Sequence, residues 1–334
     1  MRPFKYTRST DAEDASQLLM ANTKAKFLAG GTNLLDLMKE DIERPDELID
    51  VAPLNLYDIK MISNGTNKGG VSIGSLGKNS DTANHPIIRK NFPLLTQAIL
   101  AGASAQIRNM ATNGGNLLQR TRCSYFYDIA MPCNKREPGT GCSAFEGINR
   151  MHAIFGWSES CIAVYPSDMS IALAALDAVV KVQSAVGQER AIPFADFHRL
   201  PGNTPDRDNN LHHGELITSI EIPRNNFAEK SYYVKIRDRA SYAFALVSVA
   251  AAVEMEGDHI KQVRIGMGGV AHKPWRAHES EKMLLGKQAT NVNFEQAAEA
   301  EMKQAKPLEH NQFKIELGKR GIVRALQMAI QADF

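Results

Sequence analysis

Long apolar runs, a strong net charge and a secretion signal are all missing from this sequence. The longest nearly apolar run, Ala243 to Val253, has 11 residues, well short of the roughly 20 that cross a bilayer. The formal net charge of the 334 residues is +2, and the lysines and arginines are spread along the chain, which argues against a nucleic-acid surface. The basic start, Met1 to Arg8, is followed by the acidic stretch Asp11 to Asp14 instead of an apolar segment, so the sequence predicts no signal peptide.

Common short motifs of catalysis and metal binding are missing as well. The sequence has no Cys-x-x-Cys pair and no Gly-x-Gly-x-x-Gly, which argues against zinc ribbons, ferredoxin-type runs and a standard Rossmann site. Its nine histidines show no metal-binding or catalytic-triad pattern. We therefore expect no catalytic residue in this chain.

The order of helix and strand patterns indicates three successive units. Residues 1–60 alternate helix and strand signals, a polar, glycine-containing stretch at 63–70 marks a boundary, and 61–223 continues as a second α/β unit. Residues 224–334 change to successive strands followed by helical segments, which is typical of a sheet covered by helices. The sequence therefore predicts an α+β protein with two α/β subdomains and a C-terminal domain of sheet plus helices.

A glycine pair follows the second predicted strand. The strand 25–29 runs into Gly30-Gly31, and Thr32-Asn33 can then cap a helix at 34–40. Backbone N–H groups at such a turn can converge on a diphosphate without Cβ atoms in the way, and the helix dipole favours the anion. Segment 26–34 is thus a candidate pyrophosphate cradle, while an ordinary turn is the alternative.

A second glycine pair, Gly114-Gly115, repeats this chemistry between short side chains that can hydrogen-bond a phosphate or a sugar: Thr112, Asn113 and Asn116. Alone, this segment too would be read as a turn. Two such loops could clamp one extended dinucleotide.

The four cysteines of the chain all fall within 39 residues, directly after the second glycine pair: Cys123, Cys133, Cys142 and Cys161. Nine, eight and 18 residues separate them, and the intervening sequence is rich in proline and glycine. A loop of this kind can wrap a metal cluster, so we favour an iron–sulfur site with four cysteine ligands. Buried unliganded thiols, two disulfides and structural zinc are the alternatives.

Segments 25–39 and 111–119 together resemble the FAD-binding medium subunits of the xanthine dehydrogenase and carbon monoxide dehydrogenase family of molybdenum hydroxylases. The likeness covers essentially the whole chain. The residues around the four cysteines resemble a narrower group in which an extra loop of the flavin subunit holds a [4Fe–4S] cluster. Within that group the sequence most resembles the FAD and [4Fe–4S] subunits of bacterial periplasmic aldehyde oxidoreductases, and it resembles the flavin subunit of 4-hydroxybenzoyl-CoA reductase more distantly.

The resemblance implies an FAD held across the two N-terminal subdomains, which would have the PCMH-type fold. It assigns to the cofactor Lys26, Phe27, Leu28, Ala29, Gly30, Gly31, Thr32, Asn33 and Leu34 around the pyrophosphate, Thr112, Gly115 and Asn116 on the second side, and Asp168, Ile217 and Lys235 near the flavin. Without the resemblance, Asp168 could be only a helix-start carboxylate and Lys235 would be a solvated strand residue.

The resemblance also implies that the four cysteines ligate the [4Fe–4S] cluster. They lie in an insertion at 120–165, because Asn116 and Asp168 are 52 positions apart in the sequence, much farther than in simpler members. The insertion thus separates two segments that the resemblance assigns to the flavin, so we expect the cluster to lie near the FAD.

Subunits of this kind carry electrons and work with partners. The resemblance implies a heterotrimer in which a large subunit with a molybdenum cofactor converts an aldehyde and water to a carboxylic acid. A small subunit with [2Fe–2S] clusters relays the electrons, and FAD passes them to an external acceptor. It also implies a periplasmic location reached by co-export with a signal-bearing partner, with the cytoplasm as the alternative.

Two other functions stay open on the sequence alone. The chain could be a structural scaffold in which the cysteines hold zinc and the glycine segments are plain turns. It could also be an autonomous FAD oxidoreductase that acts directly on NADH or a small substrate.

Overall fold

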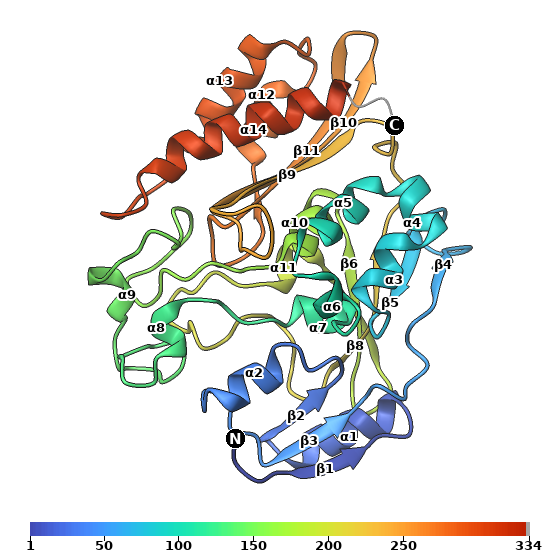
Figure 1. The fold of residues 1–334 in the computed structure, drawn as a ribbon. Coiled ribbons are helices and arrows are strands. Elements are labelled where there is room, and N and C mark those ends of the chain that lie inside the picture. The colour runs from blue at the N-terminus through green and yellow to red at the C-terminus, as the bar shows by residue number, and fades with distance from the viewer. Residues whose placement is uncertain (332–334) are drawn as a thin grey trace.

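Three sheets follow one another along the chain in the computed structural model, which describes residues 1–331 (Figure 1). The first sheet has parallel strands in the order β1-β3-β2, the second has antiparallel strands in the order β4-β5-β8-β6-β7, and the third has antiparallel strands in the order β12-β11-β10-β9. The strands are β1 Lys5–Arg8, β2 Ala25–Leu28, β3 Glu47–Asp50, β4 Ile59–Met61, β5 Val71–Gly74, β6 Val179–Gln183, β7 Glu189–Pro193, β8 Leu216–Ile222, β9 Ser231–Ile236, β10 Val247–Glu256, β11 His259–Gly268 and β12 Trp275–Arg276.

Local capping signals explain where several helices begin. Side-chain oxygens of Asp11, Ser104, Thr112, Ser167 and Thr290 accept hydrogen bonds from first-turn N–H groups of α1, α6, α7, α10 and α13. The helices are α1 Ala12–Ala21, α2 Leu34–Lys39, α3 Asn79–Asn84, α4 Pro86–Asn91, α5 Pro93–Ala101, α6 Ala105–Arg108, α7 Asn113–Leu117, α8 Ser124–Tyr127, α9 Ser143–Glu146, α10 Asp168–Ala175, α11 Phe194–Phe197, α12 His278–Leu284, α13 Asn291–Met302 and α14 Phe313–Gln331.

The strand β10 is buried on both faces, which explains the apolar run that begins at Ala243. Ala250 and Ala252 belong to the core formed with the second sheet, α5 and α10. The alternate residues Val249 and Ala251 belong to a separate core under α12, α13 and α14. A strand covered on both sides reads as a continuous apolar segment rather than an alternating one. The small alanines let helices of both layers pack close to it.

The predicted α+β class with a C-terminal antiparallel sheet and helices is confirmed. Figure 1 shows the N-terminal sheet at one end of the molecule and the C-terminal sheet with its helices at the other. The domain boundaries predicted near residues 60 and 223 stay predictions, although each lies close to a change from one sheet to the next. In the described part of the chain no helix is long and apolar enough to span a membrane.

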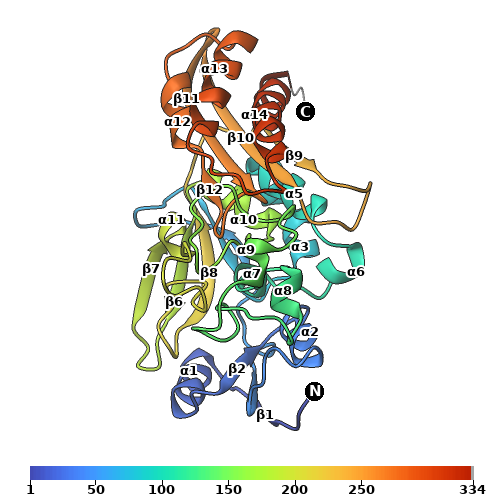
Figure 2. The ribbon, with the colours of Figure 1, turned by 90° about the vertical axis from the view of Figure 1, so that its left-hand side faces the viewer.

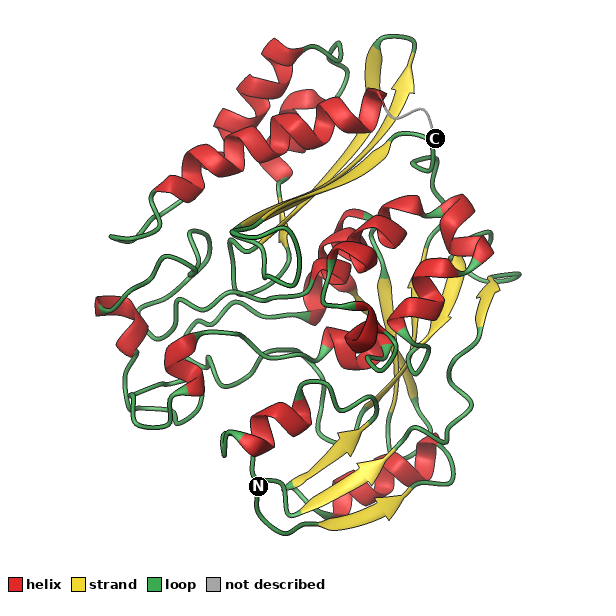
Figure 3. Cartoon of the chain, viewed as in Figure 1, coloured by secondary structure: helices red, strands yellow, loops and turns green. Residues whose placement is uncertain are grey.

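The segment that contains the cysteines is mostly loop. Between α7 and α10 it forms only the one-turn helices α8 and α9 (Figure 3). Figure 2 views the molecule from the side on which this segment lies. Because the segment has little regular structure of its own, contacts with the rest of the fold must hold it in place.

The start of α14 supplies some of these contacts. Lys314 is fully buried and its ammonium group donates hydrogen bonds to the carbonyl oxygens of His152 (2.9 Å) and Gly269 (2.7 Å). The side-chain amide of Asn311 donates to the carbonyls of His152 and Ala153, both at 3.2 Å. Burial lowers the pKa of Lys314 to about 7. The C-terminal helix thus fixes the backbone of the cysteine segment near His152.

The buried ammonium group predicts a specific pH dependence of stability. Because the folded pKa of Lys314 lies near 7, the unfolded chain binds more protons here than the folded chain between pH 7 and 10. Compared with a Lys314→Met variant, the wild-type protein should gain unfolding free energy as the pH rises through this range, by at most about 1.4 kcal/mol per pH unit. Urea unfolding of both proteins at several pH values measures the difference. A difference that is constant with pH would contradict the prediction.

Candidate functional site

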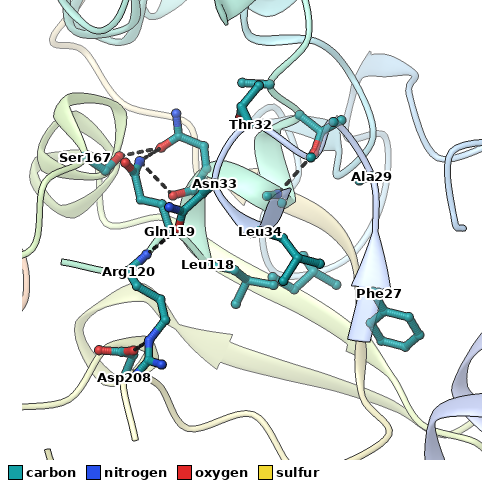
Figure 4. Close-up of a pocket in the computed structure, with 18 of the residues that line it drawn as sticks. Phe27, Ala29, Thr32, Asn33, Leu34, Leu118, Gln119, Arg120, Ser167 and Asp208 are labelled. Carbon is teal, nitrogen blue, oxygen red and sulfur yellow. Dashed lines mark hydrogen bonds and ion pairs between the residues drawn. The ribbon is translucent and has the colours of Figure 1, made fainter. Parts of the chain in front are cut away.

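A cavity of about 890 Å³ lies where the first sheet meets the second. All fifteen residues that the resemblance assigns to FAD line it, from Lys26 to Leu34 and then Thr112, Gly115, Asn116, Asp168, Ile217 and Lys235. We call it the flavin pocket, and Figure 4 shows a close-up of its lining. The structure thus brings together segments that are far apart in the sequence.

At this cavity the first glycine pair touches Met110 and Ala111, which come just before the second glycine segment. A Cβ atom on Gly30 would lie 2.1 Å from the carbonyl oxygen of Met110, so only glycine lets the two backbones approach so closely. Gly31 has a φ of +70°, in the left-handed region that favours glycine. Its carbonyl accepts a hydrogen bond from the N–H of Leu35 at 3.1 Å. Gly30 is therefore needed for the close contact with Met110, and Gly31 is needed for the turn into α2.

The second glycine segment is the start of a helix, α7, and not the loop that we expected. Thr112 caps it, and its hydroxyl accepts a hydrogen bond from the N–H of Gly115 at 3.2 Å. Asn113 is fully buried and joins Asn79, Thr82 and the carbonyl of Gly74 through its side-chain amide. This buried network holds Asn116 at the cavity wall.

Asn33 does not cap α2 with its side chain, contrary to expectation. Its Oδ1 instead accepts a hydrogen bond from the backbone N–H of Arg120 at 2.9 Å (Figure 4). Its side-chain nitrogen is buried without a partner, and so is the hydroxyl of Ser75, which also lines the flavin pocket. Unpartnered buried polar atoms are costly. A polar ligand such as a dinucleotide could satisfy both, so the lining fits FAD.

At the far end of the pocket, Asp168 and Lys235 form a buried ion pair. The ammonium group of Lys235 donates to Asp168 at 2.8 Å and to the carbonyl of Ala101 at 3.0 Å, and the hydroxyl of Tyr233 donates to the other carboxylate oxygen at 2.7 Å. The side chain of Lys235 is only 5% exposed, so it is not a solvated strand residue. Burial, together with the Asp168 charge, raises the pKa of Tyr233 well above its usual value, which keeps the phenol a donor.

Asp208 is the centre of a second, largely buried ion network that the sequence patterns did not reveal. The guanidinium of Arg120 donates to Asp208 at 2.9 Å and to Glu43 at 2.7 Å. The ammonium group of Lys135 contacts Asp208 and lies 2.8 Å from a ring nitrogen of His272. Burial alone would raise the pKa of Asp208, but the two cations outweigh it and lower the pKa to about 2. Because Arg120 and Lys135 flank the first two cysteines, this network ties the cysteine segment to the flavin pocket.

The four cysteines are free thiols and line one small pocket. Cys133 and Cys142 face each other in an isolated antiparallel bridge. Arg136 donates hydrogen bonds to the carbonyls of Tyr125 (3.0 Å) and Phe126 (2.8 Å), which ties the loop after Cys133 to the helix α8 that follows Cys123. We call this site the cysteine pocket. Among residues 1–331, however, no three His, Cys, Asp or Glu side chains converge closely enough to hold a single metal ion.

The thiol groups are mostly desolvated. Burial raises the pKa of Cys123 to about 12 and that of Cys161 to about 11, the latter in spite of the nearby charge of Lys135. Thiolates at these positions would therefore need a bound cation. The donor set, four sulfurs lining one pocket without disulfides, fits an iron–sulfur cluster with four cysteine ligands.

Comparison with known proteins gives two matching family models. Residues 2–225 match the FAD binding domain in molybdopterin dehydrogenase, and residues 232–329 match the CO dehydrogenase flavoprotein C-terminal domain. The chain is 47% identical over 330 residues to the aldehyde oxidoreductase FAD-binding subunit PaoB of Escherichia coli K12, which covers 98% of this chain and 99% of that protein. It is 30% identical over 284 residues to the glyceraldehyde dehydrogenase medium chain of Sulfolobus acidocaldarius, covering 85% and 82%.

The fold also matches solved structures. A chain of carbon monoxide dehydrogenase from Hydrogenophaga pseudoflava superposes with a TM-score of 0.75 at 24% identity, and 99% of each chain is covered. This superposition confirms the fold, and the two family models together with the two relatives confirm the predicted resemblance to FAD-binding medium subunits.

Substitution of Gly30 tests its close contact with Met110, which comes just before the second glycine segment. In a Gly30→Ala variant the added Cβ would overlap the Met110 carbonyl, so the two segments must separate. We expect a loss of about 1 to 3 kcal/mol of stability together with most of the bound FAD. Gly65→Ala is the control, because Gly65 has a φ of +81° and open space around it. That variant should be destabilised by its backbone strain and keep its FAD. Equal FAD content in the two variants would contradict the prediction.

Substitution of Asp208 tests the second ion network. An Asp208→Asn variant leaves Arg120 and Lys135 without their shared carboxylate, which should lower the unfolding free energy by about 3 to 5 kcal/mol. Because the folded pKa of Asp208 lies near 2, its contribution is fully present above about pH 4 and is lost as the pH falls toward 2.

Acid and urea unfolding measure both effects. The exposed Asp206→Asn variant serves as the control and should behave like the wild type. The prediction fails if Asp208→Asn retains wild-type stability at pH 7.

Proposed function

The chain belongs to the family of FAD-binding medium subunits of molybdenum hydroxylases, and from this we propose that it is the FAD- and [4Fe–4S]-containing electron-transfer subunit of an aldehyde oxidoreductase. One observation carries the proposal: a pocket lined by four free cysteines lies beside the flavin pocket, and Arg120 of the flavin pocket donates a hydrogen bond to the carbonyl of Lys135 in the cysteine pocket. The two relatives named above, at 47% and 30% identity, both have aldehyde-oxidising enzymes in their names.

Each part of the flavin pocket has a role in this proposal. The backbone of Gly30 to Leu34, at the start of α2, would hold the pyrophosphate, and Thr112 and Asn116 would bind from the opposite wall. The buried pair of Asp168 and Lys235 would face the flavin end of the cofactor and fix its orientation. FAD supplies the chemistry that accepts electrons and releases them in pairs.

Cys123, Cys133, Cys142 and Cys161 would supply the four thiolates of the cluster. The positive charge of the iron ions would overcome the desolvation that disfavours these thiolates. The segment between Asn116 and Cys123 belongs to both sites, so the cluster would lie near the flavin.

Substrate chemistry would take place in partner subunits. We propose a heterotrimer with a large subunit that carries the molybdenum cofactor and oxidises the aldehyde with water, and a small subunit that carries [2Fe–2S] clusters. A periplasmic location by co-export with a signal-bearing partner is also a proposal. Fractionation of cells in which the partner's signal has been deleted tests it, because this chain should then remain in the cytoplasm.

The metal and flavin content of the anaerobically purified protein separates this proposal from its alternatives. We expect about four iron atoms and one FAD per chain. A colourless protein with one zinc and no FAD would instead support a structural scaffold. Rapid reduction of the isolated chain by NADH would favour an autonomous oxidoreductase.

The ligand assignment predicts that the two cofactors can be lost separately. A Cys133→Ser variant should lose most of its iron and retain its FAD, because Cys133 does not line the flavin pocket. Iron analysis and the flavin absorption spectrum measure this. Ser124→Ala is the control, since Ser124 is exposed and adjacent to Cys123, and it should keep both cofactors. Wild-type iron content in Cys133→Ser would refute the assignment.

A further inference from the structure

A second cavity lies between the flavin pocket and the cysteine pocket. Its volume is about 460 Å³, within the range of small-molecule binding sites. Residues 166–168, Arg122 and Phe244 line both this cavity and the flavin pocket. Cys123 lines both this cavity and the cysteine pocket. We call it the intermediate cavity, and it shares a wall with each of the two proposed redox sites.

The lining of the intermediate cavity is mostly apolar. Ile171 and Tyr165 are buried in its wall, at 1% and 6% exposure. Other apolar side chains of the lining are exposed, including Ile148 (72%), Phe244 (46%) and Met151 (36%). Exposed apolar side chains gathered around a cavity are typical of a ligand entrance. The cavity therefore suits a compact apolar molecule that enters from solvent.

Two buried polar atoms in the lining lack partners. His152 is 4% exposed, and its Nε2 lies 3.1 Å from the sulfur of Cys123, but its Nδ1 has no hydrogen-bond partner. The Nε of Arg122 is likewise buried and unpartnered. Such atoms destabilise a fold unless a ligand or water satisfies them. Both residues line the intermediate cavity, so its wall is not wholly apolar.

The cationic groups of the lining are already neutralised. Arg122 forms an ion pair with Asp36 at 3.2 Å, and Arg150 forms one with Asp238 at 2.8 Å. No free cluster of donors suited to a phosphate is present among the described residues that line the cavity. These contacts favour a neutral ligand over a nucleotide.

We propose that the intermediate cavity binds a neutral two-ring quinone, which is the acceptor of the electrons that leave the flavin. The inference rests on the proposed function. The aromatic walls of Tyr125 and Phe244 suit flat rings, and Arg122 and His152 are polar residues of the same lining that would lie beside the quinone oxygens. Reduction of a quinone to its hydroquinone takes two electrons and two protons, which are the amounts released when FADH2 is oxidised to FAD. The exchange is therefore balanced without another reactant.

The test uses the assembled complex with its partner subunits. The complex is reduced anaerobically with just enough dithionite to supply two electrons per FAD and the electrons that the other redox centres take up, and is then mixed in a stopped-flow instrument with either 1,4-naphthoquinone or ferricyanide. The return of flavin absorbance gives the rate, and its dependence on quinone concentration gives the half-saturating concentration. Ferricyanide is a small hydrophilic oxidant that needs no apolar cavity.

Two variants fill the cavity and one is a matched control. Met151→Trp and Ile148→Trp add bulk to its lining, whereas Ile129→Trp adds the same bulk at an exposed position of the same segment, outside the lining of the three described pockets. We expect the two cavity variants to raise the half-saturating naphthoquinone concentration at least about tenfold. Their ferricyanide rates, iron and FAD should match the wild type. Ile129→Trp should leave every measurement unchanged.

The outcomes separate this inference from the proposed function. Wild-type naphthoquinone kinetics in both cavity variants would overturn the quinone site. Loss of FAD from both would also overturn it, because the cavity would then be part of the flavin pocket. Oxidation of the wild-type complex by ferricyanide but not by naphthoquinone would overturn it as well. If neither acceptor restored the flavin absorbance of the wild-type complex, the electron-transfer function itself would be wrong.

Discussion

The ion pairs of the Asp208 carboxylate with Arg120 and Lys135 are the interaction on which the arrangement of the flavin pocket and the cysteine pocket depends. It holds two cations, Arg120 and Lys135, that belong to a segment with almost no regular structure. Arg120 also reaches Asn33 through its backbone and Glu43 through its side chain. Removal of one partner from such a buried group leaves the others uncompensated. One carboxylate thus sets the position of the cysteine segment against the flavin pocket.

Three cavities then follow one another, and neighbouring cavities share walls. The flavin pocket and the intermediate cavity meet at 166–168 and at Arg122, and the intermediate cavity and the cysteine pocket meet at Cys123. The residues that form these walls come from loops and helix starts held by the sheets behind them. In many proteins helices and strands form a rigid scaffold, and the loops between them carry the binding residues. In the proposed function electrons would pass between these sites, and the shared walls would keep the distances short.

The sequence predicted what depends on local order along the chain. The strand, glycine turn and helix at 25–40 could be identified because each signal lies within a few residues of the next. The helical start of the second glycine segment was missed, although Thr112 three positions before Gly115 is a capping signal. Asp208 could not be found, because its partners are 73 and 88 positions away and no motif links them. From the pattern of its strand alone, Lys235 was expected to be solvated. Its burial depends on contacts with Asp168 and α5, which are distant in the sequence and leave no signal in the strand.

The contacts made by residues 310–314 have a consequence for the biogenesis of the protein. The backbone N–H of His310 donates to the side chain of Asn149, and Asn311 and Lys314 hold the carbonyl of His152. Ribosomes make residues 310–314 well after the four cysteines. The last stretch of the cysteine segment therefore acquires these anchors only after the strands of the third sheet have been made. A cofactor delivered to the cysteines before residues 310–314 have been made would meet a cysteine pocket that is not yet fully folded. We therefore expect cofactor insertion at this pocket to be post-translational.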